Sequence, residues 1–201
     1  MEFFTKPAFK AFRRDTDGSV SIETAFYLPF LLLIFASIYT YFDAFKQESA
    51  NLKAAYTVSD LISRETNAVN NDYIDSMHAL TELLIRSDSS ISLRISVIRW
   101  DEDDNRYYVD WSVNRGTQML SWTDATISDV ESRLPTMPDQ ERVILVETQN
   151  AVDAAFKIGL PDMNIYNFVF TRPRFAPQIV FEGSLTAGGT HNDEVDVEPI
   201  D

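Results

Sequence analysis

Three residues near the N-terminus, Gly18, Glu23 and Pro29, have types and positions that suggest a specific role. Glu23 is the only charged residue in the apolar run 22–42. A carboxylate inside a membrane costs a few kcal/mol near the centre and less near the surface, so it usually has a partner or a purpose. An interfacial acid without a role is the alternative. Pro29 lacks the amide that would bond to the preceding turn, which predicts a kink in a helix there.

The run 22–42 is predicted to be a membrane anchor. As a helix rising about 1.5 Å per residue it spans about 30 Å, the hydrocarbon thickness of a bilayer. It exceeds the roughly 7–15 apolar residues of a cleavable secretory signal, and it ends in aromatic residues suited to the headgroup boundary (Tyr39, Tyr41 and Phe42). The basic residues before it (Lys6, Lys10, Arg13 and Arg14) predict a cytoplasmic N-terminus. We therefore expect a single-pass inner-membrane protein with a periplasmic C-terminal domain.

The sequence has few cysteine and histidine side chains, which are kinds that often form catalytic or metal-binding sites. The chain has no cysteine, which excludes disulfides, thiolate zinc sites and cysteine nucleophiles. Its two histidines, His78 and His191, are far apart and lack partners at metal or catalytic spacing, so His78 is predicted to be structural. We predict no catalytic, cofactor-binding or metal site. An enzyme is the disfavoured alternative, and it would need two carboxylates buried in one pocket.

One acidic turn resembles a calcium loop in part. Asp101, Asp103 and Asn105 match the first three ligands of such a loop. Arg106, however, replaces the required glycine, and Ser112 replaces the closing glutamate. The turn is therefore predicted to be a solvated hairpin tip, with a weak calcium site as the alternative.

The 201-residue chain carries a net charge of −14, almost all of it after the apolar run. An acidic body repels phosphate backbones, which argues against a nucleic-acid partner. The apolar fraction of 45% is normal for a globular domain. Residues 182–201 are polar and acidic and are predicted to be a disordered tail.

The order of the N-terminal features resembles a known signal. A basic leader ends at Gly18, Glu23 follows five residues later, and the apolar helix comes next. This order is similar to the class III signal of type IV pilins and pseudopilins. Residues 23–29, ETAFYLP, resemble the E-F-A-L-V-L-P run of TadE/TadG-like minor pseudopilins of the Tad (Flp, tight adherence) pilus systems. A weaker similarity covers that family's closing strands and RPR ending (Arg142–Glu147, Gly159–Pro161 and Arg172–Arg174).

The resemblance implies a minor pseudopilin that helps to assemble a surface-adhesion pilus. A prepilin peptidase would cut between Gly18 and Ser19, and Glu23 would pair with the new terminal amine of a neighbouring subunit. Such pairing offsets the desolvation cost of both charges in lipid. The implied partners are the peptidase, other Tad pilus subunits and the inner-membrane assembly platform. The alternative is a membrane-anchored periplasmic binding or sensor module that uses the helix only as a tether.

Apolar periodicity predicts the remaining elements. Phe45, Leu52, Tyr56 and Leu61 with Ile62 recur near one face, so one helix is expected over 22–68 with that face against a sheet, a break near Asp43 being the alternative. A second helix is expected to end near residue 86. Alternation predicts two half-buried strands joined by a hairpin turn. In the first, over 91–97, the polar side faces solvent (Ser92, Arg94 and Ser96). In the second, over 106–113, the large apolar residues share one face (Tyr107, Val109, Trp111 and Val113). A short helix within 121–134 and three further strands follow (143–146, 165–171 and 178–181).

Helices first and strands later favour an α+β, pilin-like fold, with a long N-terminal helix packed on a small antiparallel sheet. The expected organisation is a leader (1–18), a transmembrane half-helix (19–42), a periplasmic domain (43–181) and a tail (182–201).

Overall fold

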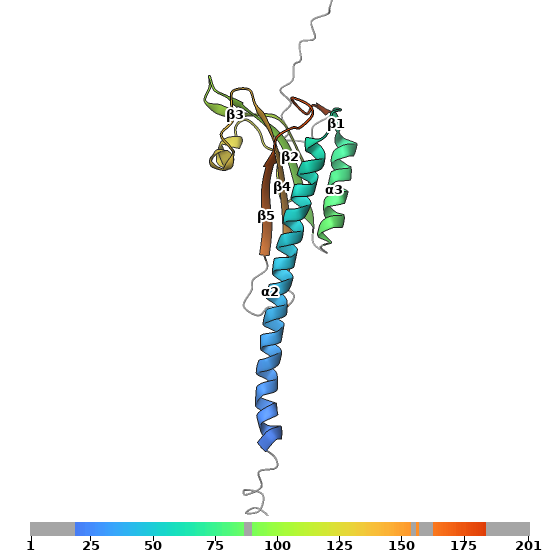
Figure 1. Ribbon diagram of the computed structural model, residues 1–201, viewed down its shortest axis with the longest axis vertical. Helices are drawn as coiled ribbons and strands as arrows, with labels where there is room; N and C mark the ends of the chain where they lie inside the picture. The colour runs from blue at the N-terminus through green and yellow to red at the C-terminus, as the bar shows by residue number, and fades with distance from the viewer. Residues whose placement is uncertain (1–18, 87–89, 154–155, 157–162, 184–201) are drawn as a thin grey trace, which may run out of the picture.

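A long helix rises from the N-terminal end of the molecule into a domain built on a four-stranded main sheet (Figure 1). The computed structural model describes residues 19–86, 90–153, 156 and 163–183. The leader 1–18 and the tail from residue 184 lie outside the described residues, so the expectations for them stay predictions. The coarse fold prediction is confirmed: a long helix packs on a small antiparallel sheet in an α+β arrangement.

Helix α2 (Ser19–Ser63) is continuous through Asp43, so the alternative of two helices is wrong. It is also uninterrupted at Pro29, and the expected kink there stays a prediction. The expected end at residue 68 is wrong. The amide groups of Arg64 and Glu65 bond to carbonyl groups only three residues back, which tightens the last turn and ends the helix.

Helix α3 (Asn71–Ile85) packs beside α2, as expected for the second helix (Figure 1). Its start is fixed by Asn70, whose side chain accepts a hydrogen bond from the amide of Tyr73. Its end is fixed by Arg86 in the left-handed conformation, with the Arg86 amide bonded to the Glu82 carbonyl.

The main sheet is antiparallel throughout and has the strand order β3-β2-β4-β5. Its strands are β2 (Ile91–Asp101), β3 (Arg106–Arg115), β4 (Arg142–Val152) and β5 (Met163–Thr171). The predicted hairpin between β2 and β3 is confirmed. Helices α2 and α3 lie on one side of the sheet, and the 3-10 helix η1 (Ile127–Arg133) lies on the other (Figure 1).

The last predicted strand does not join the main sheet. Only Phe181–Glu182 forms a strand, β6, and it pairs in parallel with β1 (Val69–Asn70). The expected strand over 178–181 is therefore mostly wrong. Its apolar residues serve the core instead, because Ile179 and Phe181 are buried around Trp111, whose indole nitrogen donates to the Ile179 carbonyl at 2.6 Å.

A β-bulge in β3 divides side chains that were expected to share one face. Val97 pairs with Trp111 and Ile98 pairs with Val109, so Asp110 is an extra residue in the ladder. Trp111 consequently faces α2, while Val109 faces η1. The predicted single face is thus wrong, because the alternation that predicted it assumes a regular strand (Tyr107, Val109, Trp111 and Val113).

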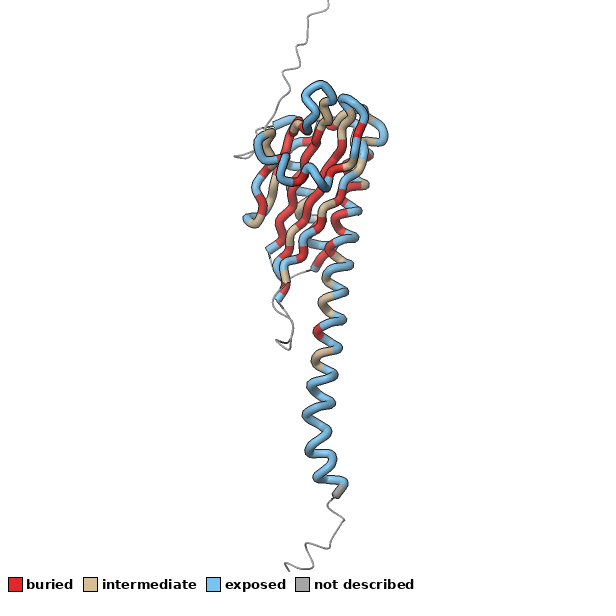
Figure 2. The backbone as a smooth tube through the Cα atoms, turned by 90° about the vertical axis from the view of Figure 1, so that its left-hand side faces the viewer, coloured by how far each residue is buried: buried red, intermediate tan, exposed pale blue. Residues whose placement is uncertain are grey.

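Strand β2 is buried on both faces, not half-buried as predicted. Figure 2 shows buried residues running along the central strands. Ser92, Arg94 and Ser96, which alternation predicted to face solvent, are all buried. The segment after β3 covers them: Ser92 accepts a hydrogen bond from the amide of Gln118, and Arg94 donates to the carbonyl of Leu120.

Candidate functional site

The first part of α2, residues 20–35, projects from the domain, and all of these residues are exposed (Figure 2). Among the described residues, α2 is the one helix long and apolar enough to cross a membrane, with a mean hydropathy of 1.8 in its most apolar window and no residue of that window buried. This surface includes Glu23, which is exposed. The structure therefore presents the one acidic side chain of the predicted span on an otherwise apolar rod.

Two of the predicted processing and assembly residues can be placed relative to each other. Ser19 is the first residue of α2, and Glu23 lies four positions later. Residues four apart share a helix face, about one turn from each other. The carboxylate would thus lie on the same face as a terminal amine at Ser19. Gly18 lies outside the described residues.

The second half of α2 contacts the sheet with a different face from the predicted one. The buried side consists mainly of small and β-branched residues (Asn51, Ala54, Ala55, Val58, Ser59 and Ile62). Of the predicted face, only Ile62 is buried. Small residues let the helix approach the sheet closely, which explains why the large apolar side chains are turned away.

These outward side chains form what we call the outer stripe of α2: Phe45, Leu52 and Tyr56. They are 67%, 40% and 59% exposed. The stripe continues the apolar surface of the first half of α2 beyond residue 42 and along the outside of the domain. Apolar surface of α2 is thus left uncovered on the outside of the domain.

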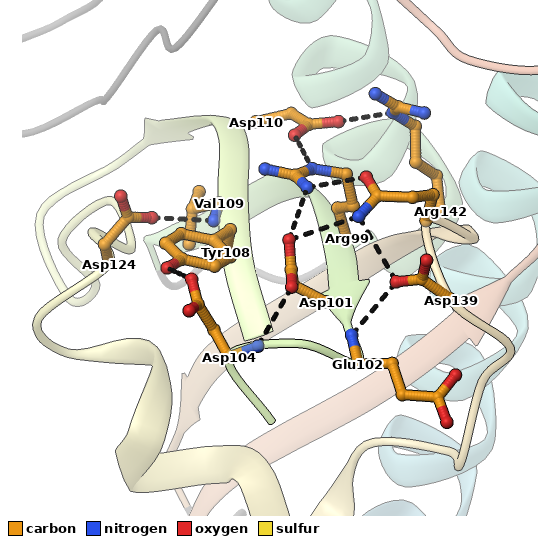
Figure 3. Close-up of polar contacts among 11 residues, drawn as sticks. Arg99, Asp101, Glu102, Asp104, Tyr108, Val109, Asp110, Asp124, Asp139 and Arg142 are labelled. Atoms are coloured by element: carbon orange, nitrogen blue, oxygen red, sulfur yellow. Dashed lines mark hydrogen bonds and ion pairs between the residues drawn. The ribbon is translucent and has the colours of Figure 1, made fainter. Parts of the chain in front are cut away.

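A polar network joins the hairpin tip to the residues before β4 (Figure 3). The bulged Asp110 accepts from Arg142 Nε at 2.6 Å and from Arg99 Nε at 3.4 Å. Asp101 accepts from the amide of Asp104 at 3.1 Å. That hydrogen bond, together with those from Gln140 and Arg99, lowers the pKa of Asp101 below its usual value.

This network bears on the calcium alternative. Asp101, the first of the three suggested ligands, is already engaged by the Asp104 amide and by the side chains of Gln140 and Arg99. No group of three or more potential metal-ligating side chains occurs among the described residues. Residues 102–106 are exposed, as expected for a solvated hairpin tip, and the calcium alternative stays untested.

His78 has the structural role expected of it. Its Nε2 lies 3.0 Å from the carbonyl oxygen of Ile91, which links α3 to the start of β2. The Glu82 carboxylate is 3.8 Å away on the next turn. His191 lies outside the described residues.

The sequence analysis missed a buried ion pair. Glu147 is 0% exposed and Arg94 is 7% exposed, and they form a bidentate pair at 2.6 and 2.7 Å. Glu147 also accepts from the indole nitrogen of Trp122 at 2.7 Å and from the hydroxyl of Tyr166. Residues 53 positions apart in the chain carry no sequence signal for this pairing. The network covers the face of the sheet that points away from α2.

Tyr166 should make stability fall at alkaline pH. Burial, with the hydrogen bond and charge of Glu147, raises the pKa of Tyr166 to about 12, against about 10 in an unfolded chain. Because the folded-state pKa is raised, this contribution is complete below about pH 10 and is lost as the pH rises through 12. Tyr166→Phe should therefore flatten the fall in unfolding free energy over that range, measured by urea titration. An unchanged slope would contradict this assignment.

Comparison with known proteins adds no relative: no family model, curated protein or solved structure matches the chain.

Proposed function

We propose that this chain is a minor pseudopilin of a Tad (Flp)-type pilus, anchored in the inner membrane with its domain in the periplasm. It would take part in assembling a fibre used for surface adhesion, together with a prepilin peptidase, other pilus subunits and the membrane assembly platform. The observation that carries the proposal is the division of α2. One unbroken helix has a free apolar half, followed by a half that packs on a sheet and keeps an apolar outer stripe.

The outer stripe favours assembly over simple tethering. A tether needs apolar residues only where it meets lipid, and the domain above it can be polar. Here Phe45, Leu52 and Tyr56 stay exposed on the water side of the expected span. Exposed apolar side chains aligned on one helix face are typical of an interaction site. Packing α2 helices side by side would cover the lipid-facing surface and the outer stripe together.

The position of Glu23 fits the same arrangement. The carboxylate lies one turn above Ser19, at the end of the helix that would enter the membrane from the cytoplasm. After cleavage, a terminal amine and a carboxylate would lie on one face of each subunit. An axial shift of one turn between two neighbouring helices brings the carboxylate of one beside the amine of the next, and each charge then compensates the other.

Intact-mass measurement of the full-length protein tests the processing step. We expect the mature product, purified from membranes of its native host, to lack residues 1–18 and to begin at Ser19. Gly18→Leu should keep the leader, because a branched side chain replaces the residue that lets the backbone extend into a protease. A wild-type product with Met1 still attached would contradict the pilus role and favour the anchored binding or sensor module.

A further inference from the structure

The end of the domain nearest the free half of α2 carries an exposed aromatic residue. Phe156 follows β4 and precedes β5, and its ring packs edge-on against Tyr39 with centroids 6.0 Å apart at 71°. Phe156 is nevertheless 47% exposed. The next helix residue, Thr40, is only 2% exposed. The domain thus reaches α2 within the apolar run 22–42, earlier than the expected boundary at residue 42.

This contact fixes where the free helix surface ends. Residues 20–35 are all exposed, and burial begins just before Thr40. A helix from Val20 to Ile38 is about 28 Å long, close to the hydrocarbon thickness of a bilayer. If α2 crosses the membrane, Tyr39 therefore lies at its outer boundary, and Phe156 lies beside it.

We infer that Phe156 is a second membrane contact, whose ring inserts into the outer headgroup boundary of the bilayer next to Tyr39. The inference rests on the proposed crossing of the membrane by α2. Phe156 then adds to an aromatic belt that the helix supplies with Tyr39, Tyr41 and Phe42, each of them exposed. Two contacts on different parts of the chain, in place of one, hold the domain at a fixed orientation above the membrane.

The neighbouring charges fit a lipid boundary. The acidic chain is repelled by anionic headgroups, so it cannot use basic residues to bind them and is better suited to a contact made by a neutral aromatic ring. Asp153, three residues before Phe156, is exposed and must stay in water. It limits insertion to the boundary zone, where aromatic rings are favoured.

Tryptophan substitutions in the full-length protein, reconstituted into phosphatidylcholine nanodiscs, test the contact. Phe156→Trp is compared with Phe30→Trp, near the middle of the expected span, and with Phe175→Trp. Phe175 is the matched control because it is also an exposed phenylalanine but lies at the far end of the domain. Its neighbour Arg174 donates its amide hydrogen to the carbonyl of Ser63, the last residue of α2. Nitroxide lipids labelled near the headgroup or deep in the acyl chain are the quenchers, and each signal is corrected for the parent protein.

We expect Phe156→Trp to be quenched by the shallow nitroxide at least about twice as strongly as by the deep one. Phe30→Trp should show the reverse order, and Phe175→Trp should resist both. If Phe30→Trp is quenched and Phe156→Trp is not, the second contact is refuted while the anchor stands. If Phe30→Trp is not quenched, α2 does not cross the bilayer, and both the anchor and the contact are refuted.

Discussion

Glu147→Gln should destabilise the protein by about 3–5 kcal/mol, the cost of breaking a buried ion pair from one side. The substitution leaves the Arg94 guanidinium buried without a counter-charge, since Glu147 supplies both oxygens of the bidentate pair. It also weakens the acceptor for Trp122 and Tyr166. Urea unfolding of the full-length protein in detergent measures the change. Trp122, 4.0 Å from the Arg94 guanidinium, is a fluorescent reporter at the site.

Two comparisons separate this effect from charge loss in general. Asp60→Asn removes a carboxylate that is paired with Arg64 and Arg174 on the surface, where such pairs contribute only about 0–1 kcal/mol. The double variant Arg94→Met, Glu147→Leu removes both buried charges and should be less destabilised than Glu147→Gln alone. The single variants Arg94→Met and Glu147→Leu complete the comparison. A double variant whose loss of unfolding free energy equals the sum of the losses in these two would show that the two residues do not act as a pair.

Sequence periodicity located most helices and strands because it shows how apolar and polar residues repeat along the chain. It does not show which other segments of the chain cover each face of a helix or strand. Ser92, Arg94 and Ser96 alternate with apolar residues, the pattern of a strand with one wet face, yet the segment after β3 buries them. The partner of Arg94 comes from β4, which lies beside β2 only once the chain has folded. A pairing of this kind depends on register, and register is set by the whole sheet.

The bulge at Asp110 and the orientation of α2 were missed for a related reason. A single extra residue reverses every later side chain of a strand, and nothing in the apolar pattern of β3 marks it. On α2, large apolar residues predicted the packed face, whereas the sheet accepts Ala54, Ala55 and Val58. Hydrophobicity alone does not distinguish a face buried within the chain from one that another molecule covers. The outer stripe is the face that sequence analysis mistook for the packed one, and it is the candidate assembly surface.

Under the proposed pilus role, Glu23→Gln should reduce surface fibres by about tenfold or more in cells that depend on this protein, while the protein stays in the membrane fraction. The amide keeps the size of the side chain but removes the charge available to a neighbouring terminal amine. A loss of about 1.4 kcal/mol at one subunit contact is enough for a tenfold effect. Membrane insertion should persist because an uncharged side chain is cheaper in lipid than a carboxylate. Sheared surface fractions and membrane fractions, probed with one antibody, give both quantities.

Glu102→Gln is the matched control, since Glu102 is an exposed glutamate in the turn between β2 and β3 and is not part of α2. Its charge is solvated in water and has no desolvation cost to offset, so fibre number should stay near wild type. Equal losses in both variants would point to a general effect of the protein's charge. Normal fibre numbers with Glu23→Gln would remove the carboxylate from the assembly mechanism, and α2 would then be a tether whose outer stripe serves some other partner.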